Sequence, residues 1–146
     1  MGKVINNRTL TVKRMLALPL PIILCNQRDD FDKGIAEAGY QTVLLNLSLA
    51  NALRDESTSE TPVNLTSIII ALLPKGEAIY LTDFEMIFDP KYNLDVMKLF
   101  SEISRHNKLI VRWCGRFSAD SLIYAEVGYE DYVIFKISEY EISCVI

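Results

Sequence analysis

The order of apolar segments along this 146-residue chain predicts an α/β fold, a three-layer sandwich around a largely parallel, five-stranded sheet. Short continuous apolar runs, typical of buried parallel strands, alternate with longer segments whose apolar residues follow helical spacing. Half of the residues are hydrophobic, which is enough for one sizeable core. The length suits one domain, so we expect a single α/β domain over residues 1–146.

Five segments have the composition expected of strands. These segments are residues 22–25, 41–46, 78–84, 108–113 and 132–137. The first begins after Pro19 and Pro21, which stop the preceding helix, and the fourth ends at Gly115. The helices expected between the strands favour parallel pairing through right-handed crossovers. Ligands of such sheets bind at the carboxyl ends of the strands, so we expect a site there.

The segments between the strands predict helices at several places. These segments are residues 8–18, 31–38, 48–54, 64–73 and 94–105. Asp29 or Asp30 suits the N-cap of the second helix, Gly39 is placed to end it, and Ser48 is a candidate cap for the third. The segment 94–105 has the clearest division into an apolar and a charged side.

Other segments leave alternatives open. Residues 64–73 contain the β-branched run Ile68–Ile70, so a strand is the alternative to the helix that we prefer there. Residues 54–62 form the most polar run in the chain and predict a surface loop. Residues 119–125 fit a short helix or a turn, and the chain is expected to end in an extended tail.

The charge balance is 15 basic against 19 acidic residues, a net charge of −4. A molecule with this balance has no strong overall attraction for nucleic acid or for an anionic membrane. The longest apolar run, near Ile68–Leu73, is far shorter than the about 20 residues that span a bilayer, and residues 1–8 have no signal-peptide core. We therefore expect a soluble, cytoplasmic protein that has no membrane partner.

The cysteines, Cys25, Cys114 and Cys144, are far apart and have no metal-ligand spacing. With a single histidine, His106, the chain does not predict a zinc site of the Cys/His type. We expect three reduced, mostly buried thiols, as is usual for a protein of a reducing compartment.

Two acidic residues, Asp83 and Glu85, come at the end of the apolar strand 78–84. Nucleotidases of the P-loop class place a magnesium-binding aspartate on such a strand. In this interpretation Asp83 is the metal ligand and Glu85 orients or activates a water molecule. The alternative is a strand end whose carboxylates are solvated or paired with a neighbouring base.

The phosphate-binding half of such a site is missing from the sequence. A P-loop has the pattern G-x-x-x-x-G-K-[ST] between the first strand and its helix, so that backbone N–H groups can surround phosphate. Here residues 25–34 contain no glycine before Gly34, and Lys33 is not followed by Ser or Thr. Three aspartates in this segment repel phosphate, so we expect no cofactor; ATP and Mg²⁺ belong only to the alternative function.

Arg112 and Arg116 flank Trp113 at the end of the strand 108–113. Arg112 is expected beside the acidic strand end, where it could pair with Asp83 or Glu85 in place of a metal ion. Trp113 fits either a core position or a protein interface.

Tyr129 and Tyr132 lie among acidic residues in the stretch 128–132, a composition that can mark a protein-contact surface. Tyrosines are also ordinary strand residues, so the alternative is a purely structural role. Arg112, Trp113, Arg116, Tyr129 and Tyr132 are therefore the candidate interaction residues.

The order and spacing of four segments resemble a known family. These segments are Val43–Leu49, Ile79–Pro90, Leu94–Gly115 and Ser121–Ala125. In this respect the chain resembles the small P-loop-containing protein of BREX-type phage-defence operons, the BrxF family. The resemblance covers most of the chain from about residue 20 to 137.

The resemblance implies a P-loop NTPase-like fold and a role in prokaryotic antiviral defence beside larger protein subunits. It carries over only Asp83 and Glu85, as Walker B-like acids, because residues 26–34 depart from the Walker A pattern. We therefore expect an accessory protein that has a degenerate Walker A loop and acts by binding partner proteins. Self-association is a further option, and we expect contact with DNA only through the partners. The alternatives are an ATPase subunit that uses Asp83 and Glu85, and an unrelated α/β interaction module.

Overall fold

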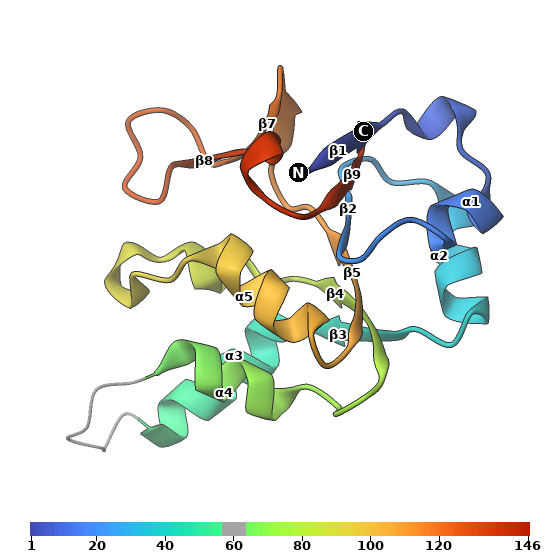
Figure 1. The fold of residues 1–146 in the computed structure, drawn as a ribbon. Helices are drawn as coiled ribbons and strands as arrows, with labels where there is room; N and C mark the ends of the chain where they lie inside the picture. Colours follow the sequence, from blue (N-terminus) through green and yellow to red (C-terminus); the bar gives the residue numbers. More distant parts are fainter. Residues whose placement is uncertain (57–63) are drawn as a thin grey trace.

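The computed structural model describes residues 1–56 and 64–146 and has a six-stranded, entirely parallel sheet at its centre (Figure 1). The strands lie in the order β1 (Lys3–Ile5), β9 (Ser143–Val145), β2 (Ile22–Leu24), β5 (Lys108–Arg112), β4 (Ala78–Thr82) and β3 (Gln41–Leu44). Each neighbouring pair is parallel. The prediction of an α/β fold with a largely parallel sheet is therefore confirmed.

The number of strands and the membership of the sheet differ from the prediction. The terminal strands β1 and β9, each three residues long, join the central sheet. Neither was predicted as a strand of this sheet; for the region of β9 the sequence predicted only an extended tail. The strand expected at 132–137 forms instead as β8 (Val133–Lys136) in a separate antiparallel sheet with β6 (Arg116–Ser118) and β7 (Ser121–Tyr124). The helix or turn expected at 119–125 is therefore largely the strand β7.

Five α-helices connect the strands within the described residues. They are α1 (Val12–Leu16), α2 (Asp29–Glu37), α3 (Leu45–Glu56), α4 (Leu65–Leu72) and α5 (Val96–Ser104). Side chains cap the amino ends of three of them, since Thr11, Asn64 and Asp95 accept hydrogen bonds from Arg14 N, Ser67 N and Lys98 N. Short 3₁₀ turns occupy Asn7–Thr9, Glu85–Phe88, Pro90–Tyr92 and Ile137–Glu139. No helix in the described ranges is long and apolar enough to cross a bilayer.

Several predicted boundaries were wrong. The helix expected at 8–18 is a 3₁₀ turn followed by the short α1. Arg28, rather than Asp29 or Asp30, occupies the N-cap position of α2, and no side chain caps it. Ser48 lies inside α3, because that helix begins at Leu45, immediately after β3.

The helix expected at 64–73 is confirmed as α4, so the alternative strand there was wrong. The expected loop at 54–62 begins within the last turn of α3, and its residues 57–62 lie outside the described residues.

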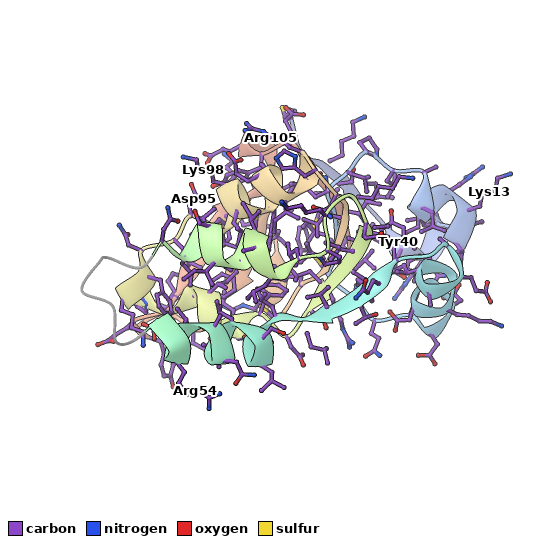
Figure 2. All side chains as sticks on the ribbon, turned by 90° about the horizontal axis from the view of Figure 1, so that it is seen from below. Lys13, Tyr40, Arg54, Asp95, Lys98 and Arg105 are labelled. Atoms are coloured by element: carbon purple, nitrogen blue, oxygen red, sulfur yellow. The ribbon has the colours of Figure 1, made fainter. Side chains whose placement is uncertain are left out.

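The sheet separates two buried clusters. On one face, Ile22, Tyr80 and Ile110 pack against α1 and α2 through side chains such as Phe31 and Ile35. The other face carries a larger cluster. In it, side chains of α3, α4, α5 and the antiparallel sheet pack against the strand side chains that point to this face. Figure 2 shows the molecule from below. In this view β3 runs across the near side, from Tyr40 to α3, which carries Arg54. Parallel sheets are usually covered on both faces, so the exposure of residues 41, 42 and 44 of β3 is unusual.

The antiparallel sheet is joined to β5 by a tight connection. A Cβ atom on Gly115 would lie 2.0 Å from the backbone oxygen of Ile123, so only glycine fits. The indole N–H of Trp113 donates to the backbone oxygen of Arg116 at 3.1 Å. This connection fixes the chain directly after β5, at the edge where the neighbouring strands also end.

Candidate functional site

The carboxyl ends of β3, β4 and β5 border a hollow of about 600 Å³, which we call the sheet-end hollow. Its wall is formed by Asp32, Ala36, Thr42, Leu44, Tyr80, Thr82, Asp83, Glu85, Arg112, Trp113 and Cys114. The volume is in the range typical of ligand pockets, about 300–1,000 Å³. A hollow therefore exists at the edge of the sheet where a site was expected. It lies on the face of the sheet that α2 only partly covers.

Strand register explains which side chains line the sheet-end hollow. Leu44 is paired with Thr82 across β3 and β4, and the pairing of Leu81 with Val111 places Thr82 beside Arg112. Because side chains alternate between the two faces of a sheet, these residues share the face that carries Tyr80. On this face α2 covers Tyr80 but leaves Leu44 55% exposed.

Asp32 of α2 is held in place by Tyr80 of β4. The Tyr80 hydroxyl donates a hydrogen bond of 3.0 Å to Asp32 Oδ1. Burial, and then the charge of Asp32, raise the pKa of Tyr80, so the phenol keeps its proton and remains a donor. The other carboxylate oxygen, Oδ2, has no hydrogen bond within the described part of the chain.

Thr82 has the only buried side-chain oxygen or nitrogen without a hydrogen-bond partner among residues 1–56 and 64–146. Its side chain is 8% exposed and belongs to the wall of the sheet-end hollow. A buried hydroxyl without a partner costs about 1–3 kcal/mol of stability. Thr82 thus combines an unpartnered hydroxyl with a position in the wall of the sheet-end hollow, and the sequence pattern did not single it out.

Asp83, the residue after β4, has a left-handed backbone with φ 47°. This conformation is unusual for a residue with a side chain and is often found at functional sites. It turns the chain from β4 into the 3₁₀ turn that begins at Glu85. The backbone N–H of Asn46 donates to Asp83 O at 2.6 Å, which supports the turn from the neighbouring strand end.

Glu85 is positioned by Asn46, a residue that the sequence did not single out. Asn46 Nδ2 donates to Glu85 Oε2 at 2.8 Å, and Asn46 Oδ1 accepts from Met86 N at 3.0 Å. The second oxygen of Glu85, Oε1, accepts no hydrogen bond within the described ranges. The only sequence signal for this contact was the position of Asn46, a polar residue at the end of the predicted strand 41–46.

The sequence suggested that Arg112 pairs with Asp83 or Glu85, but the structure shows a different partner. Its Nη2 donates to Gln27 Oε1 at 2.5 Å, and it forms no ion pair with Asp83 or Glu85, both of which are described. The expected salt bridge was therefore wrong, because Gln27, which follows β2, is the nearer partner of the exposed guanidinium.

The amino end of α2 is already occupied by charges of this chain. Its first turn contains Asp29, Asp30 and Asp32. Arg28 pairs with Asp30 through two hydrogen bonds of 2.9 and 2.5 Å and donates its remaining Nη1 to the backbone oxygens of Asn7 and Leu10. Carboxylates at a helix amino terminus take the place that a phosphate would occupy. Residues 25–28 alone separate β2 from α2, which leaves no glycine loop around an anion.

A second hollow, of about 690 Å³, adjoins the first at Glu85, and we call it the tyrosine hollow. Its wall is formed by Asn46, Glu85, Met86, Asp89, Pro90, Lys91, Tyr92, Tyr129, Glu130 and Asp131. Four of these residues are acidic and one is basic. The amino group of Lys91 lies 3.5 Å from Asp89 Oδ2 and 5.1 Å from the ring centre of Tyr92, so its charge is already partnered.

The candidate interaction residues are distributed over several surfaces. Tyr129 is 68% exposed and lines the tyrosine hollow, whereas Tyr132 lines a separate hollow beside α5. Arg116, in β6, bonds to Ala125 O and Glu126 at 3.1 and 3.0 Å. Trp113 is 5% exposed, so it is a core residue that touches the sheet-end hollow and is not available to a partner surface.

The acids of this edge do not form a complete metal site by themselves. Within the described residues, no three His, Cys, Asp or Glu side chains converge to hold a metal ion. Asp83 and Glu85 could therefore contribute only part of a coordination shell. Magnesium is usually held by one or two carboxylates together with waters and phosphate oxygens of a ligand.

Comparison of the chain with protein-family models, with curated proteins and with solved structures finds no match.

Proposed function

We propose that this chain is an accessory protein that binds other proteins, in a prokaryotic antiviral defence system of the BREX type. The tyrosine hollow carries this proposal, because exposed aromatic and charged residues gather there around one recess. The defence setting rests on the resemblance of the sequence to the BrxF family. In the same proposal, the fold is P-loop-like with a degenerate phosphate loop.

The composition of the tyrosine hollow suits a basic segment of a partner protein. Glu85, Asp89, Glu130 and Asp131 outnumber Lys91, so the recess attracts positive charge. Tyr129 offers a large exposed ring to aliphatic or cationic side chains, a common feature of binding hot spots. Val127, which is 76% exposed on the same turn, extends the apolar part of this surface.

The second candidate function is a nucleotidase that a partner completes. The position of Asp83 and Glu85 at the carboxyl end of a buried strand favours it. The carboxylates in the first turn of α2 oppose it, because they repel phosphate where a P-loop would bind it. In this function, the partner would have to provide the phosphate-binding groups.

Co-purification tests the protein-binding proposal. The tagged protein is co-expressed with the products of the genes that flank its own, and bound subunits are quantified. We expect wild-type protein to retain a subunit and the double variant Glu130→Lys, Asp131→Lys to lose at least about tenfold in affinity, since charge reversal replaces attraction by repulsion. Tyr129→Ala should weaken the complex without changing charge.

The control is Glu77→Lys, which reverses a single charge next to the amino end of β4, on the opposite edge of the sheet. A complex that survives both reversals equally well would contradict the proposal, as would the absence of any complex with the flanking gene products. A flanking region without defence subunits would favour the unrelated α/β interaction module.

A further inference from the structure

We propose that the sheet-end hollow binds the guanidinium or ammonium group of an arginine or lysine side chain, presented by the partner segment that occupies the tyrosine hollow. The source of the side chain rests on the proposed function, whereas the chemistry of the site rests on the hollow itself. Three observations carry the inference: the charge of the wall, the free oxygens of two fixed carboxylates, and the unpartnered hydroxyl of Thr82.

The wall of the sheet-end hollow is acidic. Asp32 comes from α2, Asp83 directly follows β4, and Glu85 begins the next 3₁₀ turn, so three separate segments contribute acidic residues to this wall. Arg112 is the only basic residue of this wall, and Gln27 already accepts from its Nη2. The balance of three negative charges to one favours a cationic ligand over a phosphate or a carboxylate.

Two of the carboxylates are fixed before any ligand arrives. Tyr80 donates to Asp32 Oδ1 and Asn46 donates to Glu85 Oε2, so each carboxylate is oriented by one hydrogen bond. Each keeps a second oxygen that accepts no hydrogen bond within the described ranges. A guanidinium has five N–H donors in a fixed plane and can serve several such acceptors at once.

The hydroxyl of Thr82 adds an acceptor that no residue of this chain uses. It lies in the row of side chains that continues across the sheet from Leu44 to Arg112, which is the floor of the sheet-end hollow. Because the oxygen is buried, its hydrogen-bonding capacity is lost unless a ligand donates to it. A ligand N–H group that reached this oxygen would restore the missing hydrogen bond.

The two hollows are connected in a way that suits one extended segment. Glu85 belongs to both walls, so residues in one hollow lie directly beside residues in the other. Leu44 and Leu47, 55% and 71% exposed, lie at the end of β3 and in the first turn of α3. Leu44, which belongs to the wall of the sheet-end hollow, offers apolar contact for the aliphatic stem of a long basic side chain.

Titration of the isolated full-length protein with N-acetyl-arginine amide tests the site. The neutral isostere N-acetyl-citrulline amide is the ligand control, and Trp113 in the hollow wall supplies a fluorescence signal alongside calorimetry. We expect saturable arginine binding with a Kd on the order of 1 mM, and at least about tenfold weaker binding of the citrulline compound, because a single small group offers few contacts.

Variants assign the binding to named groups. Glu85→Gln keeps an oxygen that can accept from Asn46 but removes the charge, and we expect at least about tenfold weaker binding. Thr82→Val removes only the hydroxyl and should weaken binding several-fold. Glu77→Gln, on the opposite edge, should stay within about twofold of wild type. Circular dichroism of each variant verifies that it is folded.

Equal affinity for the arginine and citrulline compounds would overturn the inference, as would unchanged affinity in both Glu85→Gln and Thr82→Val. The outcome is separable from that of the proposed function. If a partner complex forms but wild-type protein does not bind the arginine compound, the proposed function stands and the basic-side-chain site falls. If the arginine compound binds but no partner is retained, the site stands as a cation site and the proposed function falls.

Discussion

Asn46 and Glu85 are 39 positions apart, yet a hydrogen bond of 2.8 Å joins the amide of the first to the carboxylate of the second. Asn46 lies in the first turn of α3, after β3, and Glu85 begins the 3₁₀ turn after β4. The bond therefore ties together the ends of two neighbouring parallel strands. It also fixes the one carboxylate that both hollows share.

Replacement of Asn46 by Ala should loosen this edge. The change removes the hydrogen bonds to Glu85 and to the backbone N–H of Met86, so we expect a loss of about 1–3 kcal/mol in the free energy of unfolding. Urea denaturation measures the loss. Asn51→Ala, at an exposed position of the same helix, is the control and should cost much less. Equal effects of the two variants would show that the Asn46 contacts contribute nothing.

Thr82→Val should separate stability from binding. Valine has nearly the shape of threonine and removes a buried hydroxyl that has no partner, so the free energy of unfolding should rise by about 1–3 kcal/mol. The same change should weaken binding of the arginine compound. A clear loss of stability in denaturant titrations would mean that the hydroxyl has a partner in the free protein, which would contradict its assignment to a ligand.

Gly115→Ala should strongly destabilise the junction between the two sheets. The new methyl group would lie 2.0 Å from a backbone oxygen, a clash that no side-chain rotation relieves, so we expect a loss of at least about 3 kcal/mol. Gly76→Ala is a useful comparison because Gly76 has φ 73° but open space around it. That variant should cost only about 1 kcal/mol from backbone strain. Thermal unfolding of both variants checks the difference.

Cys114 should make stability fall at high pH. Burial, and then the charge of Glu85, raise the pKa of this thiol from its ordinary 9.0 to about 12 in the folded protein. Above pH 9.0 the unfolded chain loses the thiol proton while the folded protein keeps it. The stability contributed by the neutral thiol is therefore complete below pH 9.0 and declines as the pH rises towards about 12.

The measurement is urea denaturation at several pH values between 8 and 11, for wild type and Cys114→Ala. The difference in unfolding free energy between the two proteins should narrow as the pH rises, since only wild type has the thiol to titrate. A constant difference across this range would show that the thiol titrates normally in the folded state.

Nucleotide binding should be weak. With carboxylates in the first turn of α2 and no glycine loop before it, we expect no saturable response of Trp113 fluorescence to MgATP below millimolar concentration. Saturable micromolar binding would favour the nucleotidase. In that event, Glu85→Gln should abolish turnover, and unchanged turnover would remove Glu85 from the chemistry.

The sequence was sufficient for the main elements of the fold. Continuous apolar runs identified β2, β4 and β5, and the helical spacing of apolar residues identified α5, because these signals are local. The strands β1 and β9 have three residues each, too few for a periodic signal, and they form by pairing with each other across the whole chain length. The segment 119–125 formed a strand because the hairpin β6–β7 provides a pairing partner.

The site was predicted in part for the same reason. Asp83, Glu85 and Arg112 end predicted strands, so their placement at one edge followed from the parallel sheet. The contacts of Asn46 with Glu85, of Tyr80 with Asp32 and of Arg112 with Gln27 depend on strand order and register, which no local pattern encodes. The same holds for the unpartnered state of the Thr82 hydroxyl.

Quantitative co-purification with the flanking gene products is the most direct test of partner binding at the carboxyl edge of the sheet. We expect wild-type protein and Glu77→Lys to retain the same subunit, and Glu130→Lys, Asp131→Lys to lose it by at least about tenfold, since the reversed charges face the tyrosine hollow. Retention of that subunit by all three proteins to the same extent would contradict the proposal.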